Sequence, residues 1–239
     1  MLQQVKILTG RKAYEFHPDD IRISTLSIKP IQEQLQNLFQ FQASAMATPM
    51  ATFGEVPATY PPGFVFDMGV WLTPDEQQIV PIRFLHFEPR RIVIDVAGPS
   101  STITPIYNHL QNFLSQLQAA DGNPVIGEPR RILDYSEISA QFSEPLDAIF
   151  SPRIRKLLAK TMAESASGNE VVPVPTLVIQ ALSRGQEYAG TVNANEPHSF
   201  TLSQRAGSSL SESVYFSAAP LDSEIHLNYL NELEEALRF

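Results

Sequence analysis

The chain has 239 residues, of which 43% are hydrophobic and 18% charged, and its formal net charge is −9 at pH 7. This length and composition are typical of a folded globular protein, and the acidic balance argues against a general nucleic-acid binder, which carries a surplus of cations for phosphates. The sequence has no cysteine, which excludes disulfides, thiolate nucleophiles and Cys-ligated metal sites. Neither a signal-peptide pattern nor an apolar run long enough to cross a bilayer is present, so we expect a cytoplasmic protein without a membrane partner.

The first elements follow from the spacing of apolar residues. Residues 3–9 alternate as in a strand, and Ile21 and Ile23 predict a second, half-buried strand. Pro30 stands at a first-turn position and opens a helix. The stripe that this helix buries is expected to consist of Ile31, Leu35, Leu38 and Phe39.

Residues 42–62 are mostly small residues, Thr and Pro, with Glu55 as the one charge. Such a long linker inside a compact domain is unusual. Three interpretations stay open: a mobile surface loop, an arm or hairpin that docks on a partner, and an ordered lid over a pocket. Its larger apolar side chains are candidate partner contacts, namely Met46, Met50, Phe53 and Tyr60.

Three strands and a helix are predicted next, with the strands at 64–72, 79–87 and 91–97. In the first strand, strict alternation puts Phe64, Phe66, Met68 and Val70 on one face and Trp71 on the other. Trp71 is a further candidate partner anchor, because aromatic residues dominate interface energetics. Thr104 and Pro105 then begin a helix whose buried stripe is Ile106, Leu110, Phe113, Leu114 and Leu117.

The order of elements then recurs. We predict a strand near 131–138, a helix that begins at Ser151-Pro152, and strands at 176–182, 186–192, 199–204 and 212–217. Asp222 caps a last helix, whose predicted buried stripe is Ile225, Tyr229, Leu230, Leu233 and Leu237.

The recurrence predicts a duplicated α+β fold. Pro30 and Pro152 each open the middle helix of a half, and Pro99 and Pro220 each follow its last strand. We expect two pseudo-repeats, 1–123 and 124–239, that stay separate or join into one pseudo-symmetric domain. In each, short connections favour an antiparallel sheet of three to four strands with flanking helices on one face.

Motifs that carry chemistry are scarce. There is no GxGxxG, no GxxxxGK[ST] and no GxSxG, so no catalytic residue, cofactor or metal is assigned. These absences do not exclude an enzyme, but no motif supports one, and a non-catalytic protein is favoured. The best local pair is His86 with Glu88, which share a strand face with Ile82 and Phe84. That pair is either a general base with its orienting carboxylate or a salt bridge at a strand end. His17, with Asp19 and Asp20, is best explained as a solvated turn.

Charge is unevenly placed along the chain. The helix after Pro152 carries Arg153, Arg155 and Lys156, together with Lys160, while Ile154, Leu157 and Leu158 form its apolar side. The last helix is acidic. The two helices could pair within the chain, pair between protomers, contact different partners, or present two solvated faces.

Three functions are compatible with these features. The first is a non-catalytic interaction or structural subunit of a larger assembly, which binds another protein or a second copy through the residues of 42–62, Trp71 and the cations Arg153, Arg155 and Lys156. The second is a small-molecule binding module with an apolar pocket between sheet and helices, lined by Phe64, Phe66, Phe84 and Phe113. The third is an accessory role in nucleic-acid processing: the strand–helix–strand–strand–helix order resembles duplicated ferredoxin-like RNA-processing proteins and the duplicated saddle of the TATA-binding protein. The net charge argues against nucleic acid as a direct ligand.

Overall fold

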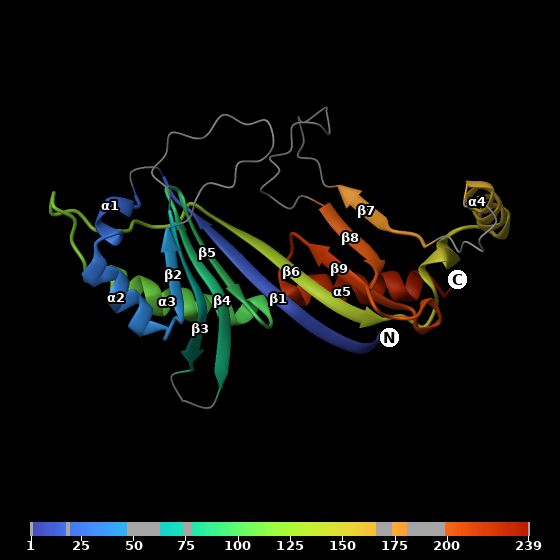
Figure 1. The fold of residues 1–239 in the computed structure, drawn as a ribbon, viewed down its shortest axis with the longest axis horizontal. Helices are drawn as coiled ribbons and strands as arrows, with labels where there is room; N and C mark the ends of the chain where they lie inside the picture. Colours follow the sequence, from blue (N-terminus) through green and yellow to red (C-terminus); the bar gives the residue numbers. More distant parts are fainter. Residues whose placement is uncertain are drawn as a thin grey trace. The chain divides into compact units, whose positions relative to one another are not determined.

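The computed structural model describes residues 2–17, 20–46, 63–73, 78–165, 174–180 and 199–238. Within these ranges the chain is a mixture of helices and antiparallel strands, and nine strands hydrogen-bond in the order β2-β3-β4-β5-β1-β6-β9-β8-β7 (Figure 1). The strands are β1 (Gln3–Glu15), β2 (Ala43–Met46), β3 (Phe64–Leu72), β4 (Ile79–Glu88), β5 (Arg91–Val96), β6 (Arg131–Gln141), β7 (Leu177–Gln180), β8 (Ser199–Gln204) and β9 (Val214–Ala219). The α-helices are α1 (Ile23–Leu26), α2 (Lys29–Leu38), α3 (Ile103–Leu114), α4 (Pro152–Ser165) and α5 (Ser223–Ala236), and short 3-10 turns occur at η1 (Ser100–Thr102), η2 (Leu146–Ile149) and η4 (Leu210–Glu212).

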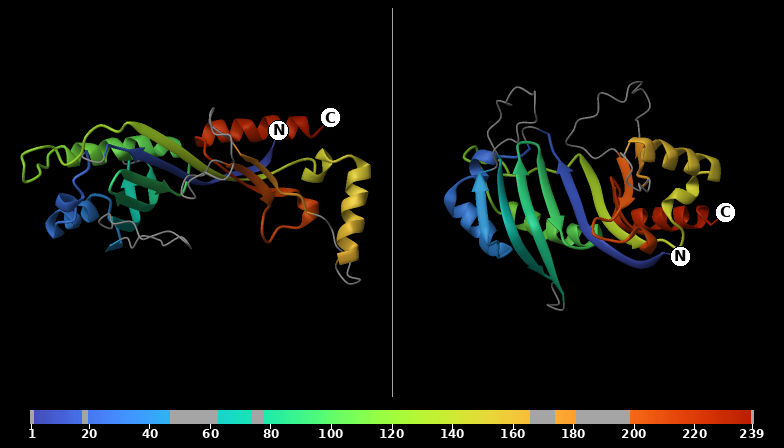
Figure 2. Two further views of the ribbon diagram at one scale, coloured as in Figure 1. Left: turned by 90° about the horizontal axis from the view of Figure 1, so that it is seen from above. Right: turned by 45° about the vertical axis from the view of Figure 1, so that its right-hand side comes forward.

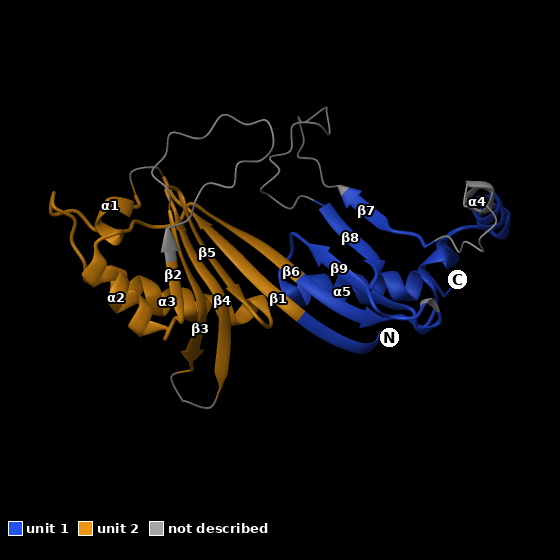
Figure 3. Ribbon diagram, in the orientation of Figure 1, with its two compact units in different colours: residues 1–7, 137–239 blue, residues 8–136 orange. Residues whose placement is uncertain are grey.

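The chain divides into two compact units (Figure 3). Unit 1 contains residues 1–7 and 137–239, and unit 2 contains residues 8–136. Strands β1 and β6 therefore contribute residues to both units. Each unit has its own hydrophobic core. The predicted α+β class is confirmed, whereas the duplication and its boundary between residues 123 and 124 stay predictions.

Unit 2 is built around one face of its strands, along which α3 lies (Figure 2). The aromatic rings of Phe64, Phe66 and Phe87 are buried there and contact one another, with centroids 4.8 to 6.4 Å apart. Tyr14 of β1 stacks on Tyr107 of α3 at 3.6 Å. Burial of so many aromatic side chains is the main source of stability for this unit.

In two neighbouring strands of unit 2, β3 and β4, the set of alternate side chains that points to the core changes halfway along the strand. Met68 of β3 has a positive φ of 55°, and the pairing of β4 with β5 shifts by one residue between Ile82 and Phe84. In β4, Val80 and Ile82 are buried before this irregularity and Leu85 and Phe87 after it. An extra residue in a strand reverses which side chains point to the core. The prediction that Trp71 lies opposite Phe66 is therefore wrong, and so is the placement of Ile82 on the face of His86.

The opposite face of these strands carries a polar network. The buried carboxylate of Asp95 accepts hydrogen bonds from Arg11, whose Nε and Nη2 both lie 2.8 Å from Oδ2. Arg83 approaches the other carboxylate oxygen to 3.4 Å. The Arg11 guanidinium also lies about 5 Å from the ring centroids of Phe84 and Tyr135. These contacts compensate the desolvation of the Asp95 charge, which burial alone would make unfavourable.

Unit 1 packs α5 against its strands (Figure 2). The buried apolar residues at this contact are Ile138, Phe142, Leu146, Phe200, Leu202, Tyr215, Ala219, Leu230 and Leu237. Asp222 caps α5 by accepting a hydrogen bond from the backbone N–H of Glu224 at 2.9 Å, as predicted. The Tyr215 hydroxyl accepts a hydrogen bond from the backbone N–H of Leu146 at 2.6 Å. This bond fixes η2 to the strands.

Buried polar groups also hold α5. The carboxylate of Glu234 is fully buried and accepts hydrogen bonds from the backbone N–H and the hydroxyl of Ser143 and from Arg238. Burial alone would raise the pKa of Glu234, but these hydrogen bonds outweigh it and the pKa is lowered.

Several predicted elements need correction. Ile21 forms an isolated bridge to Ile126, and the residues after it form α1 instead of a strand. Residues 43–46, predicted as linker, form β2 and pair with β3; the rest of the linker, 47–62, and the predicted strand 186–192 lie outside the described residues. Among the helices that the structure describes, none is long and apolar enough to cross a membrane.

Candidate functional site

Helix α4 of unit 1 exposes three large apolar side chains among its described residues. The first residues of α4 favour a helix start. Pro152 is its first residue, and the Ser151 hydroxyl accepts a hydrogen bond from the backbone N–H of Ile154 at 3.4 Å. Proline fits the first helical turn, and serine is a favoured N-cap. Its amphipathic pattern then predicts a buried apolar face.

That apolar face is exposed. Ile154 is 45% exposed, Leu157 62% and Leu158 36%. None of the three belongs to the core of either unit. Ile149, in the turn just before the helix, is also exposed. A helix that leaves the apolar face of an amphipathic pattern in water is a candidate interaction site.

Cations border this apolar stripe. Arg153, Lys156 and Lys160 are exposed and recur at helical spacing on one side of α4. Arg155 instead lies 3.7 Å from Asp147 of η2, so it holds the start of the helix to the preceding turn. We call Ile154, Leu157 and Leu158 with Arg153, Lys156 and Lys160 the α4 surface.

Because the α4 surface contributes to neither core, substitutions in it are expected to leave stability nearly unchanged. For Ile154→Ser with Leu157→Ser, we expect a change in the free energy of unfolding within about 0.5 kcal/mol, since surface substitutions seldom exceed that. Urea denaturation followed by circular dichroism measures this. A loss of several kcal/mol would mean that the face is packed within the chain.

The outer side of α5 is a second exposed amphipathic surface. Ile225 is 58% exposed and Tyr229 38%, which corrects the prediction that both belong to the buried stripe. Acidic side chains lie beside them: Glu224, Glu232 and Glu235 are exposed. The Tyr229 ring keeps one edge contact, 4.9 Å from Phe200. We call these five residues the α5 surface.

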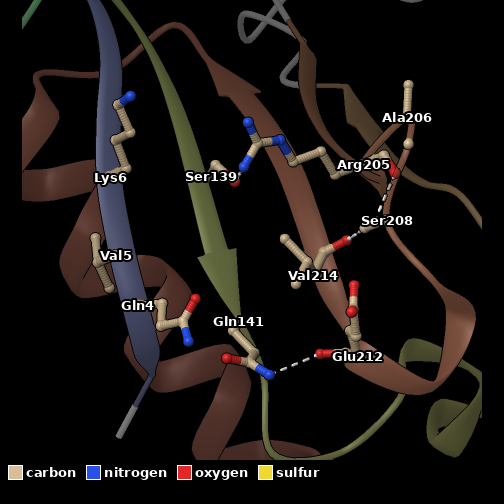
Figure 4. Close-up of a pocket in the computed structure, with 11 residues that line it drawn as sticks. Gln4, Val5, Lys6, Ser139, Gln141, Arg205, Ala206, Ser208, Glu212 and Val214 are labelled. Atoms are coloured by element: carbon tan, nitrogen blue, oxygen red, sulfur yellow. Dashed lines mark hydrogen bonds between the residues drawn. The ribbon is translucent and has the colours of Figure 1, made fainter.

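A polar groove of about 580 Å³ also lies on unit 1, between β1, β6, β9 and the β8–β9 connection (Figure 4). The Arg205 guanidinium reaches Ser139 at 3.3 Å, and Lys6 and Glu212 are the other charged groups of its lining. Gln141 donates to the backbone carbonyl of Glu212 at 3.0 Å. The groove can accept a small polar or anionic group, but its lining brings no nucleophile together with a histidine base.

His86 and Glu88 lie close together in unit 2, with His86 Nδ1 3.3 Å from the carboxylate. The same carboxylate accepts a shorter contact, 2.8 Å, from Arg91. Burial lowers the pKa of His86, and Arg91 acts in the same direction against the opposing effect of Glu88. The imidazole is therefore neutral at pH 7, and its partner carboxylate is engaged by an arginine, as in a structural ion pair at a hairpin.

A serine–histidine pair is buried in unit 1. The Ser217 hydroxyl lies 2.8 Å from His226 Nε2 and donates to the Thr201 carbonyl, also at 2.8 Å. Both side chains are almost fully buried, so a substrate has no access. The pair satisfies polar groups under α5, a structural role.

The predicted partner residues have different locations. Arg153, Arg155 and Lys156 come together on α4. Trp71 is 5% exposed and its indole N–H donates to His109 at 3.2 Å, so it belongs to the core of unit 2. Met46 ends β2, and Met50, Phe53 and Tyr60 lie outside the described residues. The acidic character of α5 and its possible pairing with the cationic helix were predicted, but the exposure of Ile225 and Tyr229 was not.

No protein-family model matches the chain, and no curated protein matches it. In the ranges that the structure describes, no group of three or more His, Asp or Glu side chains is placed to hold a metal ion.

Proposed function

We propose that this chain is a non-catalytic subunit of a protein assembly and that it binds another protein through the α4 surface. The observation that carries the proposal is the exposure of Ile154, Leu157 and Leu158 on one face of a helix bordered by cations. An amphipathic helix with a wide exposed apolar stripe is a common recognition element, which lays that stripe into a groove or onto another helix.

The energetics support a protein partner. Fully burying one Leu or Ile side chain contributes about 1.5–3 kcal/mol relative to leaving it exposed. Three such residues on one face therefore leave several kcal/mol available for binding, less the cost of association. The bordering cations would select an acidic partner surface and speed its encounter.

We also propose that the chain arose by duplication of a strand–helix–strands–helix unit. The element orders β1-α2-β3-β4-β5-α3 and β6-α4-β7-β8-β9-α5 support this, with α1 and β2 as additional elements of the first half. In this interpretation α4 corresponds to α2. Leu35 of α2 is fully buried, whereas the apolar face of α4 is exposed, as expected if α4 had acquired a partner outside its own unit.

The second predicted function, a small-molecule module, gains no support. Two of the aromatic residues predicted to line its pocket, Phe64 and Phe66, are packed in the core. The groove described above is polar, and its lining residues belong to unit 1.

Affinity capture from the native host tests the proposed function. We expect the tagged chain to capture a partner protein in stoichiometric amount. For the variant Ile154→Ser with Leu157→Ser, we expect the amount of captured partner to fall at least 10-fold, since about 1.4 kcal/mol of binding free energy corresponds to that factor. The matched control is Met68→Ser with Ile132→Ser, which removes two equally exposed apolar side chains from unit 2. Equal capture by both variants would contradict the proposal.

A further inference from the structure

We propose that the partner of the α4 surface is a second copy of this chain, and that α4 of one copy packs on the α5 surface of the next. This inference rests on the proposed function and names the partner. Three features of the two helices support it: their apolar stripes, their charges and their exposure.

The apolar stripes are matched in form. On α4 the exposed apolar residues are Ile154, Leu157 and Leu158, at spacings of three and four; on α5 they are Ile225 and Tyr229, at a spacing of four. Side chains at these spacings form the ridges and grooves by which helices pack about 8–10 Å apart. Both helices have 14 residues, so about four turns of each can face the other.

The charges are opposite. Arg153, Lys156 and Lys160 flank the apolar stripe of α4, and Glu224, Glu232 and Glu235 flank that of α5. Each helix thus has an apolar stripe with charges of one sign along its border, an arrangement that sets partner choice and orientation when helices pair. An anionic bilayer would repel a chain with a net charge of −9. A second copy of the chain, in contrast, brings the acidic helix α5 as a partner for α4.

Among the described residues, both surfaces are exposed. The apolar side chains of α4 and the outer side chains of α5 are exposed, and neither Ile225 nor Tyr229 is a core residue of unit 1. Arg155 of α4 pairs with Asp147, and Glu234 of α5 pairs with Arg238, which follows the helix. Arg153 and Lys156 of the α4 surface and Glu224, Glu232 and Glu235 of the α5 surface are exposed, so another molecule can reach them.

The contact is heterologous, because one copy gives α4 and the other gives α5. Such contacts continue into an open chain of subunits, or close into a ring if the rotation allows it. Two short helices bury less than a standard interface of about 1,600 Å², so one contact is weak, with a Kd on the order of 10–100 µM. Its exposed charges make it weaken as salt increases.

Charge reversal on each helix tests the contact. The first variant is Arg153→Glu with Lys156→Glu; the second is Glu232→Lys with Glu235→Lys. Both sets place charges that suit the helix dipole, acidic near the start of α4 and basic near the end of α5, so folding is retained. The matched control is Lys29→Glu with Arg131→Glu, which reverses two exposed cations of unit 2.

Sedimentation velocity of the purified chains gives the readout. The wild-type chain and the control are expected to associate with rising concentration and to dissociate in high salt, and each reversed variant alone is expected to be monomeric. An equimolar mixture of the two reversed variants is expected to associate again, because it contains two complementary pairs. The basic α4 of the second variant faces the acidic α5 of the first, as in the wild type, and the acidic α4 of the first faces the basic α5 of the second.

Three outcomes would overturn the inference: a monomeric wild-type chain, reversed variants that associate as the wild type does, or a mixture that stays monomeric. If the wild-type chain is monomeric but capture of a different protein still requires Ile154 and Leu157, the second copy is refuted while the proposed function stands. Wild-type binding to vesicles of anionic phospholipid that is lost in the first variant, with no self-association, would replace the second copy by a lipid surface.

Discussion

Replacing Trp71 by alanine is expected to lower the free energy of unfolding of unit 2 by about 3–5 kcal/mol, the range for truncating a large buried aromatic side chain. The indole is 5% exposed, lies in the same core as Phe66, and donates its N–H to His109. Truncation leaves a cavity and removes the donor for the imidazole nitrogen. Urea denaturation monitored by circular dichroism measures the change.

The conservative variant Trp71→Phe separates packing from the hydrogen bond. It keeps most of the apolar volume and is expected to cost about 1–2 kcal/mol, since a buried hydrogen bond contributes roughly 1 kcal/mol and some volume is also lost. If Trp71→Ala instead left stability unchanged and abolished capture of a partner, Trp71 would be an interface anchor and its burial in unit 2 would be contradicted.

The second large effect is a dependence of unit 1 stability on pH through His226. Burial lowers the pKa of His226 to about 4 from its ordinary value of 6.5. Between these two pH values the unfolded chain binds a proton that the folded chain does not. The free energy of unfolding of unit 1 is therefore highest above pH 6.5 and decreases as the pH falls toward 4. A shift of this size corresponds to a loss on the order of 3 kcal/mol.

Chemical denaturation at a series of pH values between 7 and 4 measures this loss, and two variants assign it. His226→Phe removes the titrating group, so the free energy of unfolding of unit 1 is expected to depend less steeply on pH in this variant. His86→Gln is the control, because the pKa of His86 is also lowered by burial but in unit 2. Glu234 adds to the loss only at lower pH, below the ordinary pKa of a glutamate, since its pKa is lowered. An unchanged slope in His226→Phe would show that the imidazole is not the group responsible.

Periodicity predicted the elements that have long, regular patterns. The strands β3, β4, β5 and β8, the start of α4 at Pro152, and the Asp222 cap of α5 were all predicted within a few residues. It failed where the backbone departs from regular geometry. At Met68 and Arg83 both neighbouring strands carry an irregularity, and alternation continued past it assigns Trp71 to the wrong face.

The stripe of α5 shows a second limit. Leu230 and Leu237 are buried, but the positions beside them are taken by His226 and Glu234, while Ile225 and Tyr229 face outward. A sequence pattern ranks residues by hydrophobicity, so it assigns the polar pair to water. Their burial depends on distant partners: Ser217 for the imidazole and Ser143 for the carboxylate. Those contacts become visible only when the strands are assembled.

The candidate site was predictable in composition but not in exposure. The sequence places Arg153, Arg155 and Lys156 beside an apolar stripe on one helix. In the structure Arg153 and Lys156 border that stripe, whereas Arg155 pairs with Asp147. Periodicity identifies the apolar face of a helix but not what covers it. That Ile154 and Leu157 are exposed, and that an acidic helix with a matching stripe is exposed on the same unit, required the structure.

Site-specific photo-crosslinking in the native host tests the central claim most directly. A photoreactive phenylalanine derivative at Leu157 samples the middle of the α4 surface, and the same group at Ile132, which is also exposed, is the control in unit 2. We predict one dominant protein crosslink from position 157 and none of that size from position 132. Equal crosslinking from both positions, or none from position 157, would contradict a protein-binding role for α4.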